Sequence, residues 1–357
     1  MPLPVGPHRR FDPLTRSWVL VSAGRTQRPW QGRKERGADE TRPAYDPACY
    51  LCPGNARANG ERNPDYSDTF AFTNDYAALQ PEAPLESHHD GLLVAESEPG
   101  TCRVLCFSPR HDLTLADMPP ADVRSVIDLW AAQTDELGER YRWVQVFENR
   151  GQAMGASNPH PHGQIWAGTS LPGRGEREDA AQRSHHSSTG TSLLLDIVAQ
   201  ESASERVVEI DDDWLALVPF WAVWPFETIL IPRRPAGRIS DLDDGQRSSL
   251  ARTMQRLMAR YDGLFDRPLP YSMGWHQAPF DGDTVDHWQL HAHFLPPLLD
   301  GDKRKFMVGY ELLSEPQRDI TAEDAAERLR AVQLPAAPVP KAPEPVAATA
   351  VMPGADG

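Results

Sequence analysis

Cysteine is scarce in this chain, and so is positive charge. Four cysteines among 357 residues are too few for a disulfide-stapled fold. Asp and Glu number 51 against 36 Lys and Arg, a formal charge of −15, which argues against a general nucleic-acid binder. No run approaches the roughly 18–20 apolar residues of a membrane span, and residues 1–10 contain no apolar signal core. We therefore expect a cytoplasmic protein with no membrane or nucleic-acid partner.

The length and composition are those of a globular protein with two units. Hydrophobic residues make up 40% and charged residues 24% of the chain. At roughly 100–200 residues per domain, the length fits two domains or one duplicated unit. We expect units at 1–172 and 190–333, joined by a polar linker over 173–190. Residues 334–357 are rich in Pro and Ala and poor in large apolar side chains, which predicts a disordered tail.

Two long segments have the apolar periodicity of amphipathic helices, 121–137 and 246–264. In the first, Val123, Val126 and Trp130 share one face. A third, shorter helix is expected to begin after Thr321, whose hydroxyl is a favourable cap.

Each long helix is expected within the same order of elements, namely strand, helix, strand, and a strand with a His-x-His pair. The strands are expected at 104–109, 143–147 and 160–166 in the first half, and at 229–232, 271–275 and 287–294 in the second. The two His-x-His pairs lie 131 residues apart, which indicates an internal duplication. The pattern predicts an α+β fold with mostly antiparallel sheets and helices packed on one face.

Cys49-x-x-Cys52 is the first candidate metal site. The spacing brings two sulfurs to one point, which suits tetrahedral zinc. The alternative is a pair of buried or redox cysteines. Because no second CxxC exists, the other ligands must come from distant residues, and His111 and His160 are candidates. The remaining cysteines, 102 and 106, are four apart on a strand-like run and are expected in the core.

His291-Ala-His293 is the second candidate. Residues two apart on a strand face the same side, and two imidazoles on one side suit zinc or iron. His276 ends a neighbouring strand and could add a third nitrogen. A carboxylate could come from the acidic run 176–179, whose members the spacing does not separate. The alternative is a buried histidine pair bonded to the backbone.

The segment 157–166 contains the most chemistry. His160 and His162 lie on the same side of an extended run, and Gly163 allows a ligand to approach the main chain. A neutral imidazole is a good nucleophile toward phosphorus and a good leaving group afterwards. Gln164 can donate hydrogen bonds to phosphoryl oxygens but cannot give up a proton.

The segment 158–166 resembles the active-site motif of the galactose-1-phosphate uridylyltransferase family, in the histidine-triad superfamily. Other segments that resemble the family are 25–32, 49–52, 72–75, 272–276, 287–294 and 305–311. The resemblance extends over about residues 5–333. It implies a duplicated histidine-triad-like unit, which agrees with the repeat described above.

The resemblance implies an exchange of UDP-glucose and galactose 1-phosphate for glucose 1-phosphate and UDP-galactose, in the Leloir pathway of galactose metabolism. It implies a ping-pong route in which His162 attacks the α-phosphorus and carries UMP, while Gln164 holds the non-bridging oxygens. It also implies a homodimer whose active sites are shared between subunits. Sugar phosphate is already a good leaving group, so a further histidine as proton donor is not needed.

The resemblance also implies the ligand sets. The zinc ligands would be Cys49, Cys52, His111 and His160, and the ligands of a second site for iron or zinc would be Glu178, His276, His291 and His293. Both metals would be structural. The substrate contacts would be Arg25, Arg28, Asn74, Asp75, Asn149, Ser157, Gln164, Lys305, Phe306, Tyr310, Glu311 and Gln317.

Two other functions compete with this one. A dinucleoside polyphosphate hydrolase or phosphorylase of the same superfamily would share the nucleophile, but Gln164 in place of a third histidine counts against it. A non-enzymatic metal-binding protein would explain the Cys and His clusters and leave Arg25, Arg28 and Gln164 without a purpose. Since the chain is acidic overall, local cations such as Lys305 must make the pocket positive for an anionic substrate.

Overall fold

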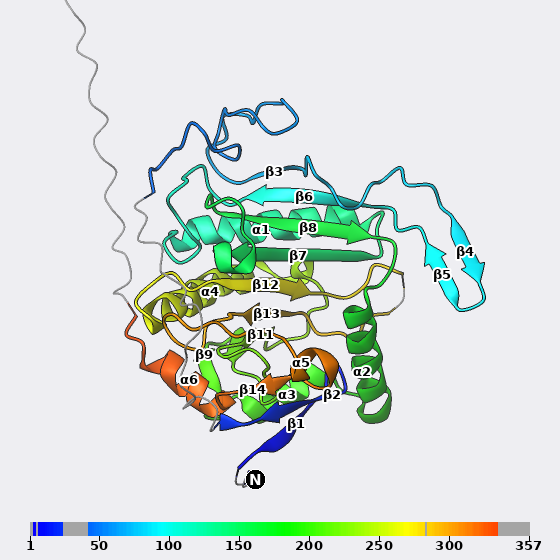
Figure 1. Ribbon diagram of the computed structural model, residues 1–357, viewed down its shortest axis with the longest axis vertical. Helices are drawn as coiled ribbons and strands as arrows, with labels where there is room; N and C mark the ends of the chain where they lie inside the picture. The colour runs from blue at the N-terminus through cyan, green and yellow to red at the C-terminus, as the bar shows by residue number, and fades with distance from the viewer. Residues whose placement is uncertain (1–2, 5, 24–41, 283, 335–357) are drawn as a thin grey trace, which may run out of the picture.

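A continuous nine-stranded sheet forms the centre of the protein (Figure 1). The computed structural model describes residues 3–4, 6–23, 42–282 and 284–334. In spatial order the strands are β3 (Phe70–Thr73), β6 (Gly100–Cys106), β8 (His162–Gly168), β7 (Trp143–Arg150), β12 (Tyr271–His276), β13 (His291–Leu295), β11 (Thr228–Pro232), β10 (Trp214–Leu217) and β9 (Val207–Ile210). Every neighbouring pair is antiparallel, as predicted.

The predicted duplication is visible in the sheet order. The first half runs β6, α1 (Pro120–Gly138), β7, β8, and the second runs β11, α4 (Asp244–Leu264), β12, β13. The two copies meet where β7 pairs with β12, and from this seam the strand order outward is the same in both. The sheet therefore continues across the predicted units 1–172 and 190–333, and their division stays a prediction.

The two long helices begin where their sequences favour a helix start. Pro120 occupies the first turn of α1, where its missing N–H costs no hydrogen bond. Asp243 caps α4, because its side chain accepts a hydrogen bond from the backbone N–H of Gln246, whose own side chain bonds back to the cap. Both predicted helices are confirmed, with starts one or two residues earlier.

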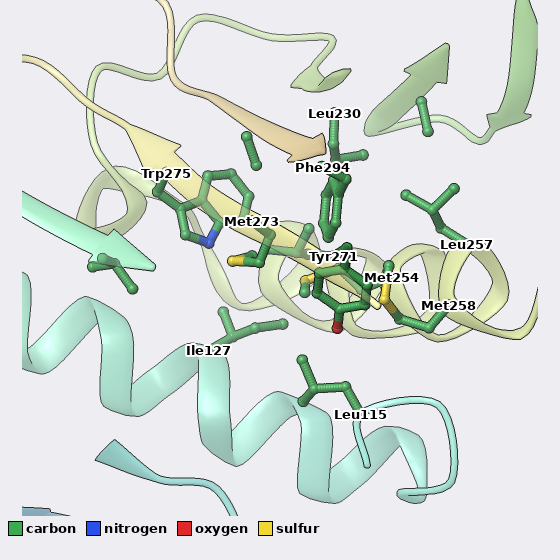
Figure 2. Packing of buried hydrophobic residues seen from close by; sticks show 14 of the residues in the cluster. Leu115, Ile127, Leu230, Met254, Leu257, Met258, Tyr271, Met273, Trp275 and Phe294 are labelled. Carbon is green, nitrogen blue, oxygen red and sulfur yellow. The ribbon is translucent and has the colours of Figure 1, made fainter. Parts of the chain in front are cut away.

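The main core lies between these two helices and one face of the sheet. α1 and α4 pack against each other, and Figure 2 shows Ile127 of α1 and Met254 of α4 pointing toward Met273 and Trp275 of β12. Trp275 lies 6.4 Å from Trp130 between ring centroids, in an edge-on contact. The predicted single-face packing of the long helices is confirmed.

The opposite face of the sheet is covered by elements that the sequence analysis did not predict. These are α3 (Leu193–Glu201) and a small sheet of β1 (His8–Asp12), β2 (Ser17–Val21) and β14 (Gln317–Arg318). Strand alternation separates the two cores, since Leu215 and Leu217 face α3 while Trp214 and Ala216 face α4.

The predicted linker 173–190 is wrong: this segment is the helix α2 (Gly173–Thr189), which Figure 1 shows beside the sheet. No apolar stripe indicated a helix, because the buried face of α2 consists of polar and small residues. Glu178 and Gln182, one turn apart, are buried against the sheet. Gly190 ends the helix in the left-handed conformation, at φ 77°.

The remaining elements lie at the periphery. They are the hairpin β4 (Ser87–Asp90) and β5 (Leu93–Glu96), which projects from the body in Figure 1, the short α5 (Tyr310–Leu313), α6 (Ala322–Ala331), and the 3-10 turns η2 (Gln152–Met154) and η3 (Ile239–Asp241). Thr321 caps α6 as predicted, accepting a hydrogen bond from the N–H of Asp324 at 3.0 Å. None of the helices in the described ranges combines the length and apolar composition needed to cross a membrane. The predicted tail, apart from Leu334, lies outside the described residues.

Candidate active site and metal centres

Strand β8 places the candidate nucleophile on the face of the sheet opposite α1. Ile165 and Ala167 point into the core under α1, so His162, Gln164 and Trp166 project from the other face. β13 repeats this arrangement, since Ala292 and Phe294 face the core and the His291/His293 pair does not. Both His-x-His pairs therefore open on the same side. β13 begins at His291, so His287 precedes the strand.

His162 lies in a small pocket beside the loop that precedes β8. The pocket is lined by Asn149, Gly155, Ala156, Ser157, His162, Gly163 and Gln164. Four of the predicted site residues, numbers 149, 157, 162 and 164, thus share one cavity. Asn149 is oriented by Ser272, whose hydroxyl donates to its side-chain oxygen at 2.6 Å.

One hydrogen bond determines which nitrogen of His162 can react. Its Nδ1 lies 2.8 Å from the backbone oxygen of His160, so Nδ1 carries the proton and donates it. In the neutral ring this leaves the lone pair on Nε2. Burial lowers the pKa of His162 from its ordinary value, which favours that neutral, nucleophilic form.

Gln164 is oriented by the indole of Trp166. The indole Nε1–H donates to Gln164 Oε1 at 3.1 Å. Since an indole can only donate, the contact fixes the amide oxygen toward Trp166 and directs the two amide N–H donors elsewhere. The side chain is therefore arranged to donate hydrogen bonds inside the pocket.

Replacing Gln164 by Ala is expected to lower kcat by about 10²–10³-fold, the cost of losing one preorganised donor to developing charge. Trp166→Phe, which removes only the orienting bond, should produce a smaller loss in the same direction. Steady-state kinetics of both variants measure this, and equal losses would contradict the orienting role.

The first predicted metal group is assembled in the structure. Cys49, Cys52, His111 and His160 are all buried, and one ligand atom from each lies within 4.8 Å of the others. Cys52 Sγ is 3.6 Å from His111 Nδ1 and 3.5 Å from His160 Nδ1. Tetrahedral zinc, with Zn–S about 2.3 Å and Zn–N about 2.0–2.1 Å, places sulfur and nitrogen about 3.6 Å apart. The residues fit zinc.

Three residues around this group hold His160 in place, and their pattern in the sequence predicted no such role. His160 Nε2 donates to the Ser108 carbonyl at 2.9 Å, which leaves Nδ1 for a metal. Tyr66 lies 3.2 Å from the same Nε2 through its hydroxyl, and Asn158 Oδ1 accepts from the His160 N–H at 2.9 Å. Polar residues in loops of this kind carry no periodic signal. Cys102 and Cys106, in contrast, are buried as predicted.

The second predicted group is also assembled, around α2. One ligand atom from each of Glu178, His276, His291 and His293 lies within 4.8 Å of the others. His276 Nδ1 is 2.6 Å and His291 Nε2 is 3.5 Å from Glu178 Oε2. His291 Nε2, although buried, has no hydrogen-bond partner among the described residues, which fits a ligand atom. Of the acidic run, the structure brings Glu178 to the histidines.

The charges at the second group suit a cation. Burial opposes ionisation of Glu178, yet His276 and His291 hold its pKa well below the usual range. Burial lowers the pKa of His293, so its ring is neutral, the form in which imidazole binds metals. Asp179, the next residue, turns away and lies 2.7 Å from His287 Nε2.

A buried acid lies directly behind the pocket. Glu148 precedes Asn149 on β7 and accepts a hydrogen bond from the Tyr271 hydroxyl at 2.9 Å. Burial raises the pKa of Glu148 to about 7, even though Arg150 favours its charged form. Arg150 is engaged elsewhere, donating to both oxygens of Asp262 at 2.7 Å.

Glu148→Gln is expected to stabilise the protein increasingly as pH rises from 5 to 8. A carboxyl whose folded pKa exceeds its unfolded value contributes stability at low pH, and that contribution is lost between about pH 4.3 and 7. The Gln variant has no carboxyl to titrate at this position. Between pH 5 and 8 its free energy of unfolding should therefore rise relative to that of wild type by on the order of 2–3 kcal/mol. Thermal melts at each pH measure this, with Glu82→Gln at an exposed position as control. A difference in melting temperature between the two proteins that does not change with pH would contradict this prediction.

The other predicted substrate residues that the structure describes are not among those that line this pocket. Arg25 and Arg28 lie outside the described residues. Asn74 and Asp75 follow β3, and Asp75 lies 4.0 Å from Arg57. Lys305, Glu311 and Gln317 form a separate group, the C-terminal cluster. In it Lys305 Nζ is 2.7 Å from Glu311 Oε1 and also bonds the carbonyl of Gln317.

The C-terminal cluster lies well away from the start of β8 in Figure 1, where α5 is on the other side of the seam. Phe306 and Tyr310, beside it, are 50% and 54% exposed.

Gly163 has a different reason from the one predicted. A Cβ at this position would lie 2.7 Å from the ring of Phe107 and 2.9 Å from the carbonyl oxygen of Phe147. Glycine is therefore required by packing within the sheet, since the side-chain position is filled by the protein and not by a ligand.

Two family models together match most of the chain. The N-terminal domain of galactose-1-phosphate uridyl transferase matches residues 4–172, and the C-terminal domain matches residues 176–338. The galactose-1-phosphate uridylyltransferase of Haemophilus influenzae is 52% identical over 329 residues, covering 91% of this chain and 94% of the relative. That of Rattus norvegicus is also 52% identical, covering 90% and 87%.

Solved structures agree with these matches. A uridylyltransferase structure superposes with a TM-score of 0.73 at 28% identity, covering 91% of this chain and 97% of the other. An ADP-glucose phosphorylase from Arabidopsis thaliana with bound ADP-glucose superposes with a TM-score of 0.74 at 20% identity, covering 92% and 100%. The second likeness concerns the fold alone.

Proposed function

Because this chain belongs to the galactose-1-phosphate uridylyltransferase family, we propose that it transfers UMP from UDP-glucose to galactose 1-phosphate. The products are glucose 1-phosphate and UDP-galactose, and the reaction places the protein in the Leloir pathway of galactose metabolism. The observation that supports this most directly is the bond from His162 Nδ1 to the His160 carbonyl. It leaves Nε2 available in a polar pocket, while burial keeps the imidazole uncharged.

The first half-reaction forms a bond from His162 Nε2 to the α-phosphorus of UDP-glucose. The bond from that phosphorus to the bridging oxygen breaks, and glucose 1-phosphate leaves with the electron pair. Its phosphate is a stable anion, so no proton donor is required at the leaving oxygen. Gln164, oriented by Trp166, donates hydrogen bonds to the non-bridging oxygens.

The second half-reaction reverses the first with a different sugar phosphate. A phosphate oxygen of galactose 1-phosphate attacks the same phosphorus, the bond to Nε2 breaks, and His162 returns to its neutral state. Asn149 and Ser157, which line the pocket, are proposed to contact the nucleotide. Arg25, Arg28, Asn74 and Asp75 are proposed for the same role.

The two metal groups are proposed to be structural. Cys49, Cys52, His111 and His160 would hold zinc, and Glu178, His276, His291 and His293 would hold iron or zinc. Bound zinc cross-links ligands that are distant in sequence and stabilises the thiolate form of cysteine. His160 belongs to both the zinc group and the chain segment that holds His162, so a metal there would fix the direction of the nucleophile.

We propose that the protein is a homodimer in which the C-terminal cluster of one subunit contributes to the active site of the other. Lys305, Glu311 and Gln317 are held together, and the neighbouring Phe306 and Tyr310 are exposed, apart from the pocket of their own chain. In a dimer these residues would reach the pocket of the second subunit and contact the sugar phosphate there. A cytoplasmic location stays a prediction, supported by four free cysteines.

The function is tested by following UMP. The protein is incubated with UDP-glucose alone, quenched and digested, and the peptide containing His162 is weighed by mass spectrometry. We expect the added mass of UMP on that peptide, and its transfer to UDP-galactose when galactose 1-phosphate is added. Rapid release of UMP without an acceptor would favour the dinucleoside polyphosphate hydrolase, and no adduct would favour a non-enzymatic metal-binding protein.

A further inference from the structure

The second metal group contains a cation that belongs to the protein. Arg174 lies one helical turn before Glu178 on α2, and its Nε donates to Glu178 Oε1 at 2.9 Å. Its Nη2 lies 3.3 Å from Nε2 of His293. The guanidinium thus contacts Glu178 and His293, two of the four residues of the group, at Oε1 and Nε2.

These contacts compete with metal binding. Two ligand atoms bound to one metal at about 2.1 Å in a tetrahedron are about 3.4 Å apart. His291 Nε2 and Glu178 Oε2 are separated by 3.5 Å, which fits that spacing, but His293 Nε2 lies 4.0 Å from Glu178 Oε1. The pair to which Arg174 donates is wider than that spacing, whereas His276 Nδ1 and Glu178 Oε2, which Arg174 does not separate, lie closer than it at 2.6 Å.

The charge of Arg174 also opposes metal binding. Glu178 is completely buried, and its neighbours are histidines, so one negative charge is available to balance a bound cation. Arg174 already neutralises that charge. A divalent ion beside the guanidinium would leave uncompensated positive charge in a buried site, which is costly at low dielectric.

Arg174 is able to leave. Its side chain is 43% exposed, whereas that of Glu178 is 0% exposed, so the guanidinium can turn outward without disturbing the core. Two other buried carboxylates, Asp12 and Glu227, interact electrostatically with the guanidinium where it now lies, so an outward turn has to overcome their attraction.

We propose that Arg174 is an internal counter-ion that competes with the metal for Glu178 and His293, so that it lowers the metal affinity of this site and holds the site together when the metal is absent. The inference rests on the proposed metal site at these four residues. It predicts that the Cys49/Cys52 group binds zinc far more tightly than the group around Glu178, which has this competitor.

The test is zinc binding by full-length variants. Wild type, Arg174→Gln, Arg174→Lys and Arg177→Gln are equilibrated with chelator-buffered Zn²⁺, and bound zinc per chain is counted by mass spectrometry of the metal. His291→Ala identifies the equivalent that belongs to the second group. Thermal melts at very low free zinc provide a second readout that is independent of catalysis.

We expect Arg174→Gln to bind the second zinc at least tenfold more tightly than wild type, and to melt several degrees lower when zinc is withheld, because Glu178 then lacks a cation. Arg174→Lys, which keeps the charge, should stay close to wild type, as should Arg177→Gln at an exposed position of the same helix. An unchanged or weaker second equivalent in Arg174→Gln would overturn the role of Arg174. Wild type and His291→Ala with equal zinc content would instead overturn the metal site itself.

Discussion

His162→Ala is expected to lower uridylyl transfer by at least about 10⁴-fold, since removing a covalent nucleophile eliminates the step on which the other groups act. The protein should still fold, because His162 is only partly buried and its ring makes one hydrogen bond to the backbone. The measurements are the rate of UDP-galactose formation and the UMP adduct after incubation with UDP-glucose. Both should disappear, while the melting temperature and the zinc content stay within error of wild type.

A matched control distinguishes the nucleophile from other histidines. His89→Ala changes an exposed residue of the projecting β4–β5 hairpin and should leave transfer unchanged. Transfer at the wild-type level in His162→Ala would show that another residue carries UMP. A loss of zinc in this variant would show instead that the substitution had damaged the neighbouring His160.

Cys52→Ala is expected to remove one equivalent of zinc and to lower the melting temperature by about 10 °C or more, because a structural zinc contributes directly to folding free energy. Cys52 is 0% exposed, and its sulfur lies 3.5–3.6 Å from both histidines of the group. Burial raises the pKa of the Cys52 thiol to about 11, so without a metal the thiolate is not formed.

Activity should fall together with zinc in this variant. The carbonyl of His160 fixes the proton of His162 on Nδ1, and the ring of His160 belongs to the proposed zinc group, so a released His160 is expected no longer to hold the reactive nitrogen in place. Metal analysis, thermal melts and transfer rates are measured on one preparation. Cys102→Ala, at a buried cysteine outside the group, is the control and should keep its zinc. Full activity in a zinc-free Cys52→Ala would contradict the link between the two histidines.

Predictions from the sequence were right for elements that depend on local spacing and wrong for elements that depend on contacts with distant residues. α1 and α4 were predicted because each buries an apolar stripe, and a stripe is recorded in the sequence at fixed spacing. α2 was missed because its buried face combines Glu178 and Gln182 with two small residues, Gly175 and Ala181, and this set contains no large apolar side chain that a periodicity could detect. What buries them is the sheet, including His276 on β12, a residue almost a hundred positions away.

The candidate site divides in the same way. The ligand sets predicted from the resemblance, Cys49 with His160 and Glu178 with His293 among them, are each brought together. The substrate residues are only partly brought together: Asn149, Ser157 and Gln164 share the His162 pocket, whereas Lys305 pairs with Glu311 in a cluster near α5, on the other side of the seam from β8. The reason for Gly163 was also misjudged, because the space beside it is filled by Phe107, a contact that only the folded sheet creates.

The sequence by itself determined the duplication, the two long helices and the side-chain types available for chemistry, because these depend on local spacing along the chain. Only the tertiary structure decided that β7 and β12 form the seam, that α2 is a helix, that the His160 carbonyl selects the reactive nitrogen of His162, and that Arg174 lies among the second group of ligands. Each of these depends on the direction of a hydrogen bond or on burial by a distant segment. Neither quantity exists until the strands have paired, so neither is written in local spacing.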